Sequence, residues 1–228
     1  MSLYFYINLA IVIFPLIFSF ERRIKYYSKA KSVLLSTLSV GALFIAWDAF
    51  ATYRGHWSFN PSHICEIELF GLPIEEILFF VTVPYSCLFI FEAILYFFGD
   101  SRIFSPNKWL FVGVGVGVAL ILISFGFYSK EYTLLAILSV GLSILFVSFF
   151  SVRIFSSRAY WIYTFVTFWL FFVFNCVLTS LPVVEYSPSA ISGLRVITIP
   201  IEDFMFNFSM LTLYLAVYLW ARGSSRVK

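Results

Sequence analysis

Seven long apolar runs divide this sequence and restrict the chain to a bundle of membrane-spanning helices. A helix that crosses a bilayer needs about 20 apolar residues. Runs of that kind occur at about 2–20, 33–53, 73–98, 108–128, 131–152, 159–181 and 199–221. The chain has 228 residues, of which 61% are hydrophobic and 12% charged, so it is far more apolar than a soluble domain. Because only helices and closed barrels satisfy their backbone groups in lipid, we expect an all-α integral membrane protein with seven transmembrane helices.

The basic residues predict how this bundle is oriented, because lysine and arginine accumulate in cytoplasmic loops. Three of the fifteen, Arg54, Lys130 and Arg195, fall on one side of the predicted bundle. The other twelve fall on the opposite side and are Arg22, Arg23, Lys25, Lys29, Lys31, Arg102, Lys108, Arg153, Arg158, Arg222, Arg226 and Lys228. We therefore expect a multi-pass protein of the cell membrane with its N-terminus outside and its C-terminus in the cytoplasm. The net charge of +3 reflects this topology and indicates no nucleic-acid partner.

Cysteine and histidine give no familiar ligand pattern. The cysteines lack paired spacing, which predicts neither a disulfide framework nor a metal site; they are Cys65, Cys87 and Cys176. One loop leaves a metal site open as an alternative, although its spacing matches no common ligand set; its candidate ligands are His56, His63, Glu66 and Glu68. We expect no metal.

An internal repeat is the most informative feature of the sequence. A shift of 127 residues places the motif Pro-Ile-Glu-Glu, residues 73–76, on Pro-Ile-Glu-Asp, residues 200–203, without a gap. The same shift places Asp48 on Asn175, Pro61 on Pro188 and Phe79 on Phe206. We expect a first three-helix repeat over 1–107, a connector helix over 108–128 and a second repeat over 129–228. Both repeats would enter the membrane in the same direction, related by a pseudo-twofold axis along the membrane normal.

The acids of the two motifs are the candidate catalytic residues: Glu75, Glu76, Glu202 and Asp203. Carboxylates at a helix start can serve only to stabilise its dipole and free amides. Here the acids follow apolar pairs within a membrane bundle, where ionisable residues are costly and mark functional sites. Asp48 and Asn175 are expected at the same depth. Neighbouring carboxyl groups in a poorly solvated site differ in proton affinity, so one can act as a general acid and another as a base.

Aromatic rings surround these acids in the sequence. Such rings can pack against lipid or other helices, or they can stabilise a carbocation by up to about 2 kcal/mol each when desolvated. With the two polar residues just named, they are our substrate-binding candidates: Asp48, Phe79, Phe80, Tyr85, Asn175, Phe204 and Phe206. Glu92 lies about 24 Å along a straight helix from Glu76, so we expect a structural role or a distal binding region for it.

Two stretches resemble the flavin-free, membrane-integral lycopene cyclase family. In "HWSFNPSHICEIELFGLPIEEILFFVTVPYSCLFIFE", residues 56–92, an Asn-Pro loop, the acid motif, a helix proline and a distal glutamate match in order. The matching residues are Asn60, Pro61, Pro73, Glu75, Glu76, Pro84 and Glu92. In "GLRVITIPIEDFMFNF", residues 193–208, the second block matches at Gly193, Arg195, Pro200, Glu202 and Asp203. The chain is similar to the fused, single-chain form of a cyclase that is a heterodimer in some bacteria.

This resemblance implies a lycopene β-cyclase, which converts the acyclic ends of lycopene to β-ionone rings, first in γ-carotene and then in β-carotene. The reaction is an isomerisation through a carbocation and transfers no electrons overall, so we expect no flavin or other cofactor. The implied partners are lycopene, other carotenoid intermediates and membrane lipid, with no obligatory protein partner. Cyclases that form ε-rings or act on C50 carotenoids remain open.

A small membrane transporter or channel is the main alternative from another class, because parallel repeats and buried acids occur there too. The acids would then bind protons or cations. The spans lack broken-helix signals and a polar stripe, which disfavours a water-lined path. The last span also lacks the lysine that a retinal Schiff base would need. Alternating glycines at positions 113, 115 and 117 lie within a span, where they favour close helix packing over nucleotide binding.

Overall fold

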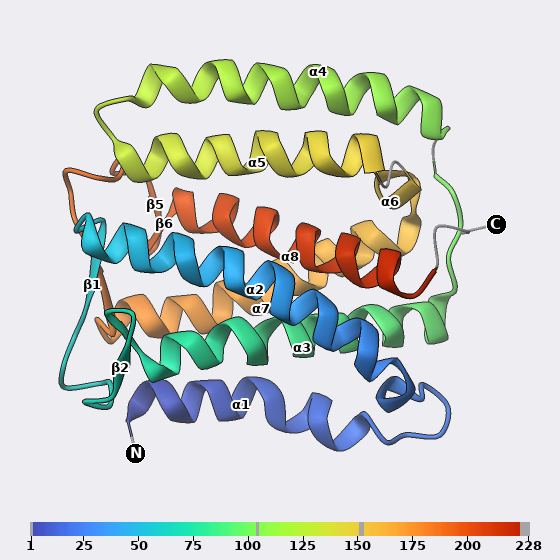
Figure 1. Cartoon of the computed structure of the whole chain (residues 1–228), viewed down its shortest axis with the longest axis horizontal. Helices are drawn as coiled ribbons and strands as arrows, with labels where there is room; N and C mark the ends of the chain where they lie inside the picture. The colour runs from blue at the N-terminus through green and yellow to red at the C-terminus, as the bar shows by residue number, and fades with distance from the viewer. Residues whose placement is uncertain (1, 104, 151–152, 224–228) are drawn as a thin grey trace.

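Long helices lie side by side in the computed structural model, which describes residues 2–103, 105–150 and 153–223 (Figure 1). The helices are α1 (Leu3–Phe18), α2 (Ala30–Tyr53), α3 (Ile74–Phe98), α4 (Pro106–Ser124), α5 (Glu131–Phe150), α6 (Arg153–Ser156), α7 (Arg158–Ser180) and α8 (Ile201–Ala221). Two 3-10 turns, η1 (Tyr26–Lys29) and η2 (Phe125–Phe127), join them. Arg226, Lys228 and the last two residues of the predicted run 131–152 lie outside the described residues.

The prediction of a mostly helical membrane protein is confirmed. Within the described ranges, six helices are long and apolar enough to cross a membrane: α2, α3, α4, α5, α7 and α8, the first together with η1 and the third with η2. The predicted first span, 2–20, forms only the 16-residue helix α1, which is shorter than a full span needs. The helix starts after its N-cap Ser2 and ends soon after Pro15. Six spans of sufficient length are therefore found where seven were predicted.

Short strands, which the all-α prediction omitted, gather at the end of the bundle where α3 and α8 begin (Figure 1). They form three two-stranded antiparallel sheets. β1 (Trp57–Phe59) pairs with β4 (Val184–Tyr186), β2 (Glu68–Leu69) with β3 (Leu72–Pro73), and β5 (Arg195–Val196) with β6 (Ile199–Pro200). These strands are two or three residues long, too short for an alternating pattern to reveal them in the sequence.

The loops before α3 and α8 are held in the same way. The amide of Ile74 donates to the carbonyl of Ile67 at 2.9 Å, and 127 residues later the amide of Ile201 donates to the carbonyl of Leu194 at 3.0 Å. Each loop thus closes onto the first residue of the helix that follows it. This closure fixes where the acid motif of each helix enters the bundle.

The helix proline Pro84 links α3 to α8. Proline lacks an amide hydrogen, so the carbonyl of Phe80, four residues earlier, loses its helical donor. The hydroxyl of Tyr214 in α8 donates to this carbonyl at 2.8 Å. A Cβ added to Gly41 of α2 would lie 3.0 Å from the same hydroxyl, so glycine lets α2 approach it closely. Neighbouring helices thus satisfy a backbone group that lipid could not.

α1 is attached to α3. Pro15 leaves the carbonyl of Ile11 without a helical donor, and Ser86 of α3 donates its hydroxyl there at 3.1 Å. Nearer the acid motif, the hydroxyl of Thr82 donates to the side-chain oxygen of Asn8 at 2.6 Å. These bonds explain how a helix of 16 residues is held on the outside of the bundle (Figure 1).

α4 and α5 pack closely through glycines, as the alternating glycine motif predicts. A Cβ added to Gly117 of α4 would lie 2.7 Å from the Leu145 side chain of α5. A Cβ added to Gly141 of α5 would lie 2.9 Å from the Gly117 carbonyl oxygen. Gly115 has open space around its Cβ position, so only part of the motif serves this contact.

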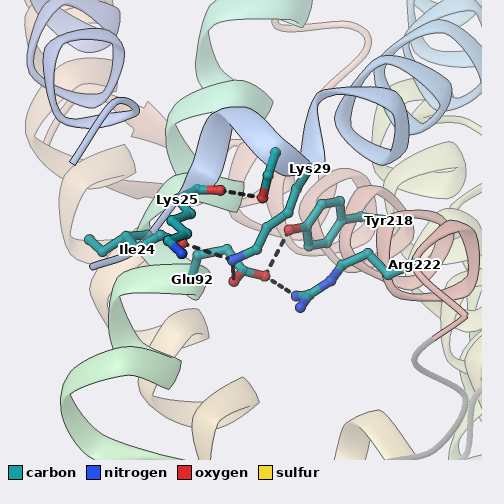
Figure 2. Close-up of polar contacts among 7 residues, drawn as sticks. Ile24, Lys25, Lys29, Glu92, Tyr218 and Arg222 are labelled. Atoms are coloured by element: carbon teal, nitrogen blue, oxygen red, sulfur yellow. Dashed lines mark hydrogen bonds and ion pairs between the residues drawn. The ribbon is translucent and has the colours of Figure 1, made fainter. Parts of the chain in front are cut away.

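Glu92 anchors the opposite end of the bundle (Figure 2). Its buried carboxylate, only 4% exposed, forms ion pairs with Lys29 of η1 and with Arg222 just after α8. The hydroxyl of Tyr218 donates to the same carboxylate at 2.7 Å, and the Lys29 ammonium also donates to the carbonyl of Ile24 at 3.2 Å. One side chain of α3 thereby holds the turn before α2 and the end of α8. Of the two roles expected for Glu92, this geometry supports the structural one.

Glu92→Gln should therefore destabilise the fold. Removing the charge leaves Lys29 and Arg222 without a counter-ion in a largely buried cluster, which costs about 3 kcal/mol. We expect the midpoint of thermal unfolding in detergent to fall by roughly 5–10 °C. The exposed Glu21, in the same turn of the chain, offers the matched control Glu21→Gln, which should leave the midpoint unchanged. Equal midpoints for both variants would refute this role of Glu92.

Candidate active site

Glu76 and Asp203 meet at one cavity of about 70 Å³ at the strand-bearing end of the bundle. Each is the second acid of its motif and lies in the first turn of α3 or α8. The cavity is lined by polar residues and aromatic rings from both halves of the chain: Tyr4, Asp48, Trp57, Phe59, Glu76, Phe79, Phe80, Tyr132, Phe171, Asn175, Leu178, Val184, Tyr186, Asp203 and Phe206. The second acids of the two motifs thus share one site.

Three donors surround the carboxyl group of Asp203. Tyr132 donates its hydroxyl to Oδ1 at 2.7 Å, while Asn175 and Tyr186 donate to Oδ2 at 2.9 and 2.6 Å. Burial raises the pKa of Tyr186 well above its usual range, so this residue stays a neutral phenol and can donate. Three hydrogen bonds to a carboxyl group stabilise its ionised form. The arrangement around Asp203 therefore suits a carboxylate that accepts a proton.

Glu76 has a different neighbour, the carboxyl group of Asp48. The two side chains are hydrogen-bonded to each other. Tyr4 donates its hydroxyl to Glu76 at 2.6 Å, and the Trp57 indole donates to Oδ1 of Asp48 at 3.0 Å. Because an ionised carboxylate can only accept hydrogen bonds, a bond between two carboxyl groups requires a proton on one of them. The pair therefore holds a proton inside the cavity.

The first acids of the two motifs lie outside this cavity. Glu75 accepts a hydrogen bond from the Cys65 amide at 2.8 Å and another from the Ser2 hydroxyl. Glu202 accepts from the Ser192 amide at 2.7 Å and from the Thr133 hydroxyl at 2.5 Å. Both side chains are fully buried, and each fastens the preceding loop to the start of its helix. This geometry gives Glu75 and Glu202 a supporting role.

The substrate-binding candidates fall into two groups. Asp48, Asn175, Phe79, Phe80 and Phe206 line the cavity. Two others do not. Phe204 packs against the Phe171 ring at a centroid distance of 5.1 Å. Tyr85 lies in the middle of α3, where its hydroxyl is 2.5 Å from that of Ser19, near the end of α1.

Sequence analysis missed several residues of the cavity, among them Tyr4, Tyr132, Trp57 and Tyr186. Tyr4 and Tyr132 donate to the acids of opposite halves but stand 128 residues apart, so the ungapped shift of 127 does not align them. A comparison that allowed one gap would have paired them. Trp57 and Tyr186 face each other in the β1–β4 pair, which only the tertiary structure brings together.

The loop considered as an alternative metal site has other contacts. The His56 ring stacks on the Tyr132 ring at 6.2 Å, and its Nε2 lies 3.2 Å from a carboxylate oxygen of Glu131. Within the described residues, no three His, Cys, Asp or Glu side chains are grouped so that they could hold a metal ion. His56, His63, Glu66 and Glu68 therefore do not form a ligand set.

The supporting role of Glu75 predicts a local effect of Glu75→Ala. The Cys65 amide would lose its acceptor, a hydrogen bond to a charged group that contributes about 1.5–3 kcal/mol. Its hydrogen exchange should become roughly ten- to a hundredfold faster. Glu68→Ala, at an exposed position of the same loop, is the control and should leave that amide unchanged. Unaltered exchange at Cys65 in Glu75→Ala would contradict the assignment.

Comparison with known proteins agrees with this site. The sequence model of the family described as "Lycopene cyclase" matches residues 1–94 and 129–221. Searches of the curated proteins and of the solved structures returned no match. The matched residues include both acid motifs and all of α1, α2, α3, α5, α7 and α8, leaving out α4. Because the match covers most of the chain, this protein belongs to the lycopene cyclase family, whose members are enzymes of carotenoid biosynthesis.

Proposed function

We propose that this protein is a lycopene β-cyclase that converts the acyclic ends of lycopene to β-ionone rings, giving γ-carotene and then β-carotene. Family membership supports a carotenoid cyclase. The observation that carries the reaction is the unequal pair of acid sites in one cavity. A proton shared by Asp48 and Glu76 stands near a carboxylate, Asp203, that three donors stabilise.

The proposed reaction moves one proton in and one proton out. The Asp48–Glu76 pair protonates the terminal carbon–carbon double bond of lycopene and leaves a tertiary carbocation. The neighbouring double bond attacks this cation, which closes the six-membered ring and moves the positive charge into it. Asp203 then removes a ring proton, and the electrons of that carbon–hydrogen bond form the ring double bond. No electrons leave the substrate, so the enzyme is an isomerase of the intramolecular lyase type, and we propose that it needs neither flavin nor metal.

The cavity walls suit a cationic intermediate. Phe79, Phe80 and Phe206 lie in the wall beside the acids, and the Phe80 and Phe206 ring centroids are 6.4 Å apart. A desolvated aromatic face stabilises a cation by up to about 2 kcal/mol. Because Asp203 and the Asp48–Glu76 pair share one cavity, the proton taken by Asp203 can return to the pair before the next turnover.

We further propose that two parallel three-helix repeats, 1–107 and 129–228, flank a connector helix over 108–128. The β1–β4 pair supports this arrangement, because Ser58 lies opposite Glu185, its counterpart at a shift of 127. An antiparallel strand pair has a local twofold axis between such residues. In this proposal α1 is the seventh span. With both halves on one chain, no obligatory protein partner is needed.

The membrane orientation is also a proposal. The loops on the side of Glu92 contain most of the lysines and arginines, while the strand-bearing side has Arg54, Lys130 and Arg195. The positive-inside rule then places the C-terminus in the cytoplasm and the acid cavity near the outer surface of the cell membrane. A long hydrocarbon substrate would reach the cavity from the bilayer.

Expression in a bacterium that accumulates lycopene tests the reaction and the residue roles. The unaltered protein should convert lycopene to β-carotene. Glu76→Gln, Asp48→Asn and Asp203→Asn keep side-chain size but remove the proton donor or acceptor, so each should slow cyclisation by at least about a hundredfold. Glu66→Gln, in the exposed loop, should behave like the unaltered protein. Pigment chromatography, with protein amounts measured in the membrane fraction, gives the result.

Two outcomes of this experiment would count against the proposal. Unchanged lycopene with the unaltered protein well expressed would contradict cyclase activity. Full activity in all three acid variants would contradict the proton-transfer roles. An ε-ring product would keep the acid roles but place the proton removed by Asp203 at another ring carbon.

A single small cavity also predicts the order of products. It can hold one end of an extended C40 chain, so the second ring requires release and reversal of the substrate. Free γ-carotene should therefore appear before β-carotene in a time course with purified enzyme and excess lycopene. Formation of β-carotene with no γ-carotene under these conditions would refute this sequence of events.

A further inference from the structure

A second, larger cleft of about 340 Å³ adjoins the acid cavity between α1, α3, α7 and α8. Phe79, Phe171, Asn175 and Leu178 belong to the walls of both, so the two spaces are continuous. Apart from Asn175 and three other polar side chains, the cleft is lined by apolar residues. Its volume lies in the usual range for ligand sites.

The cleft runs along the bundle, away from the acids. On α3 its wall extends from Phe79 to Ile90, which is roughly 16 Å of helix. Near the acid cavity, Tyr4 and Ile7 of α1 pack with Leu178 of α7. Among the described residues, no hydrogen bond joins α1 to α7. α1 and α7 therefore form two walls that are not fastened to each other along the length of the cleft.

Small side chains keep this space open. Cys87 lines the cleft, whereas the residue 127 positions later is Tyr214, which is fully buried between α2, α3 and α8. Asn207 also lines the cleft, whereas the residue 127 positions earlier is Phe80, whose ring is 1% exposed. Large aromatic rings thus fill the matching positions of the other half.

Asn207 points to the kind of ligand. Its side chain is 2% exposed, and its amide nitrogen has no hydrogen-bond partner in the described part of the chain. It lies one helical turn from Asp203, in the wall of a cleft that is otherwise almost apolar. A buried donor can be partly satisfied by the π electrons of a conjugated chain through a weak N–H···π contact, which a saturated acyl chain does not offer.

We propose that this cleft binds the polyene chain of the acyclic carotenoid, with one end group in the acid cavity. The substrate enters from the lipid between α1 and α7, and the remainder of the chain leaves the bundle on the same side. This assignment rests on the proposed function, since it takes the cyclase substrate as the occupant. A phospholipid acyl chain is the competing occupant that the experiment below distinguishes.

Bound pigment in an inactive background tests the cleft without relying on turnover. Glu76→Gln protein, purified in mild detergent from lycopene-accumulating bacteria, should retain lycopene, measured as polyene absorbance per protein. Adding Cys87→Tyr reproduces the aromatic residue of the other half and fills the cleft, so bound polyene should fall by about tenfold or more. Adding Cys176→Tyr, the same change on α7 outside the cleft wall, should leave bound polyene within about twofold of the background.

A second pair of variants guards against misfolding of Cys87→Tyr. Leu170→Trp narrows the α7 wall, and Leu142→Trp makes the same change on the exposed face of α5. Only Leu170→Trp should lose bound polyene. Undiminished polyene in folded Cys87→Tyr or Leu170→Trp protein, or co-purifying phospholipid with no polyene in the Glu76→Gln background, would overturn the cleft assignment. If Glu76→Gln protein contains cyclised carotenoid instead of lycopene, the acid role fails while the amount of bound polyene still decides the cleft.

Discussion

Carboxyl groups inside this bundle need either a proton or hydrogen-bond donors, and much of the structure supplies one or the other. Burying an uncompensated charge away from water is costly, so each acid requires its own partners. The outer loops return to donate the Cys65 and Ser192 amides to the first acids of the motifs. α1 and α5 contribute Tyr4 and Tyr132 to the second acids. The short strands and the place where α1 begins follow from these demands.

The repeat tells how the halves correspond, and the differences between them tell how the site works. Asp48 and Asn175 occupy matching positions, yet one shares a proton with Glu76 and the other donates to Asp203. Two identical sites would both be proton donors or both be acceptors. A single difference between carboxyl and amide gives the cavity one of each, and that is the combination an acid–base cyclisation needs.

Much of this arrangement could be predicted from the sequence, and the remainder depends on tertiary contacts. Long apolar runs predict the helices, and the motif spacing predicts that acids of both halves come to similar depth. Glu75 and Glu76 cannot be distinguished in the same way, because successive residues of a helix point about 100° apart and only packing decides which faces the axis. Phe204 and Tyr85 were assigned to the site for their residue type, whereas their helix faces direct them to Phe171 and Ser19. The cleft could not be predicted either, since it depends on which small residue faces which helix.

The helix α4 leaves the walls of the acid cavity untouched: it lies at the edge of the bundle beside α5, and the cavity lining contains none of its residues (Figure 1). Its position matters for how such an enzyme can change over generations. Two identical subunits around a twofold axis would carry the same residue on both sides, so a substitution could never affect one side alone. A chain that contains both halves is free of that restriction. Each half can acquire its own substitutions, one side keeping an acid while the other exchanges it for an amide, and a symmetric ancestor can diverge into an enzyme with two unlike sides.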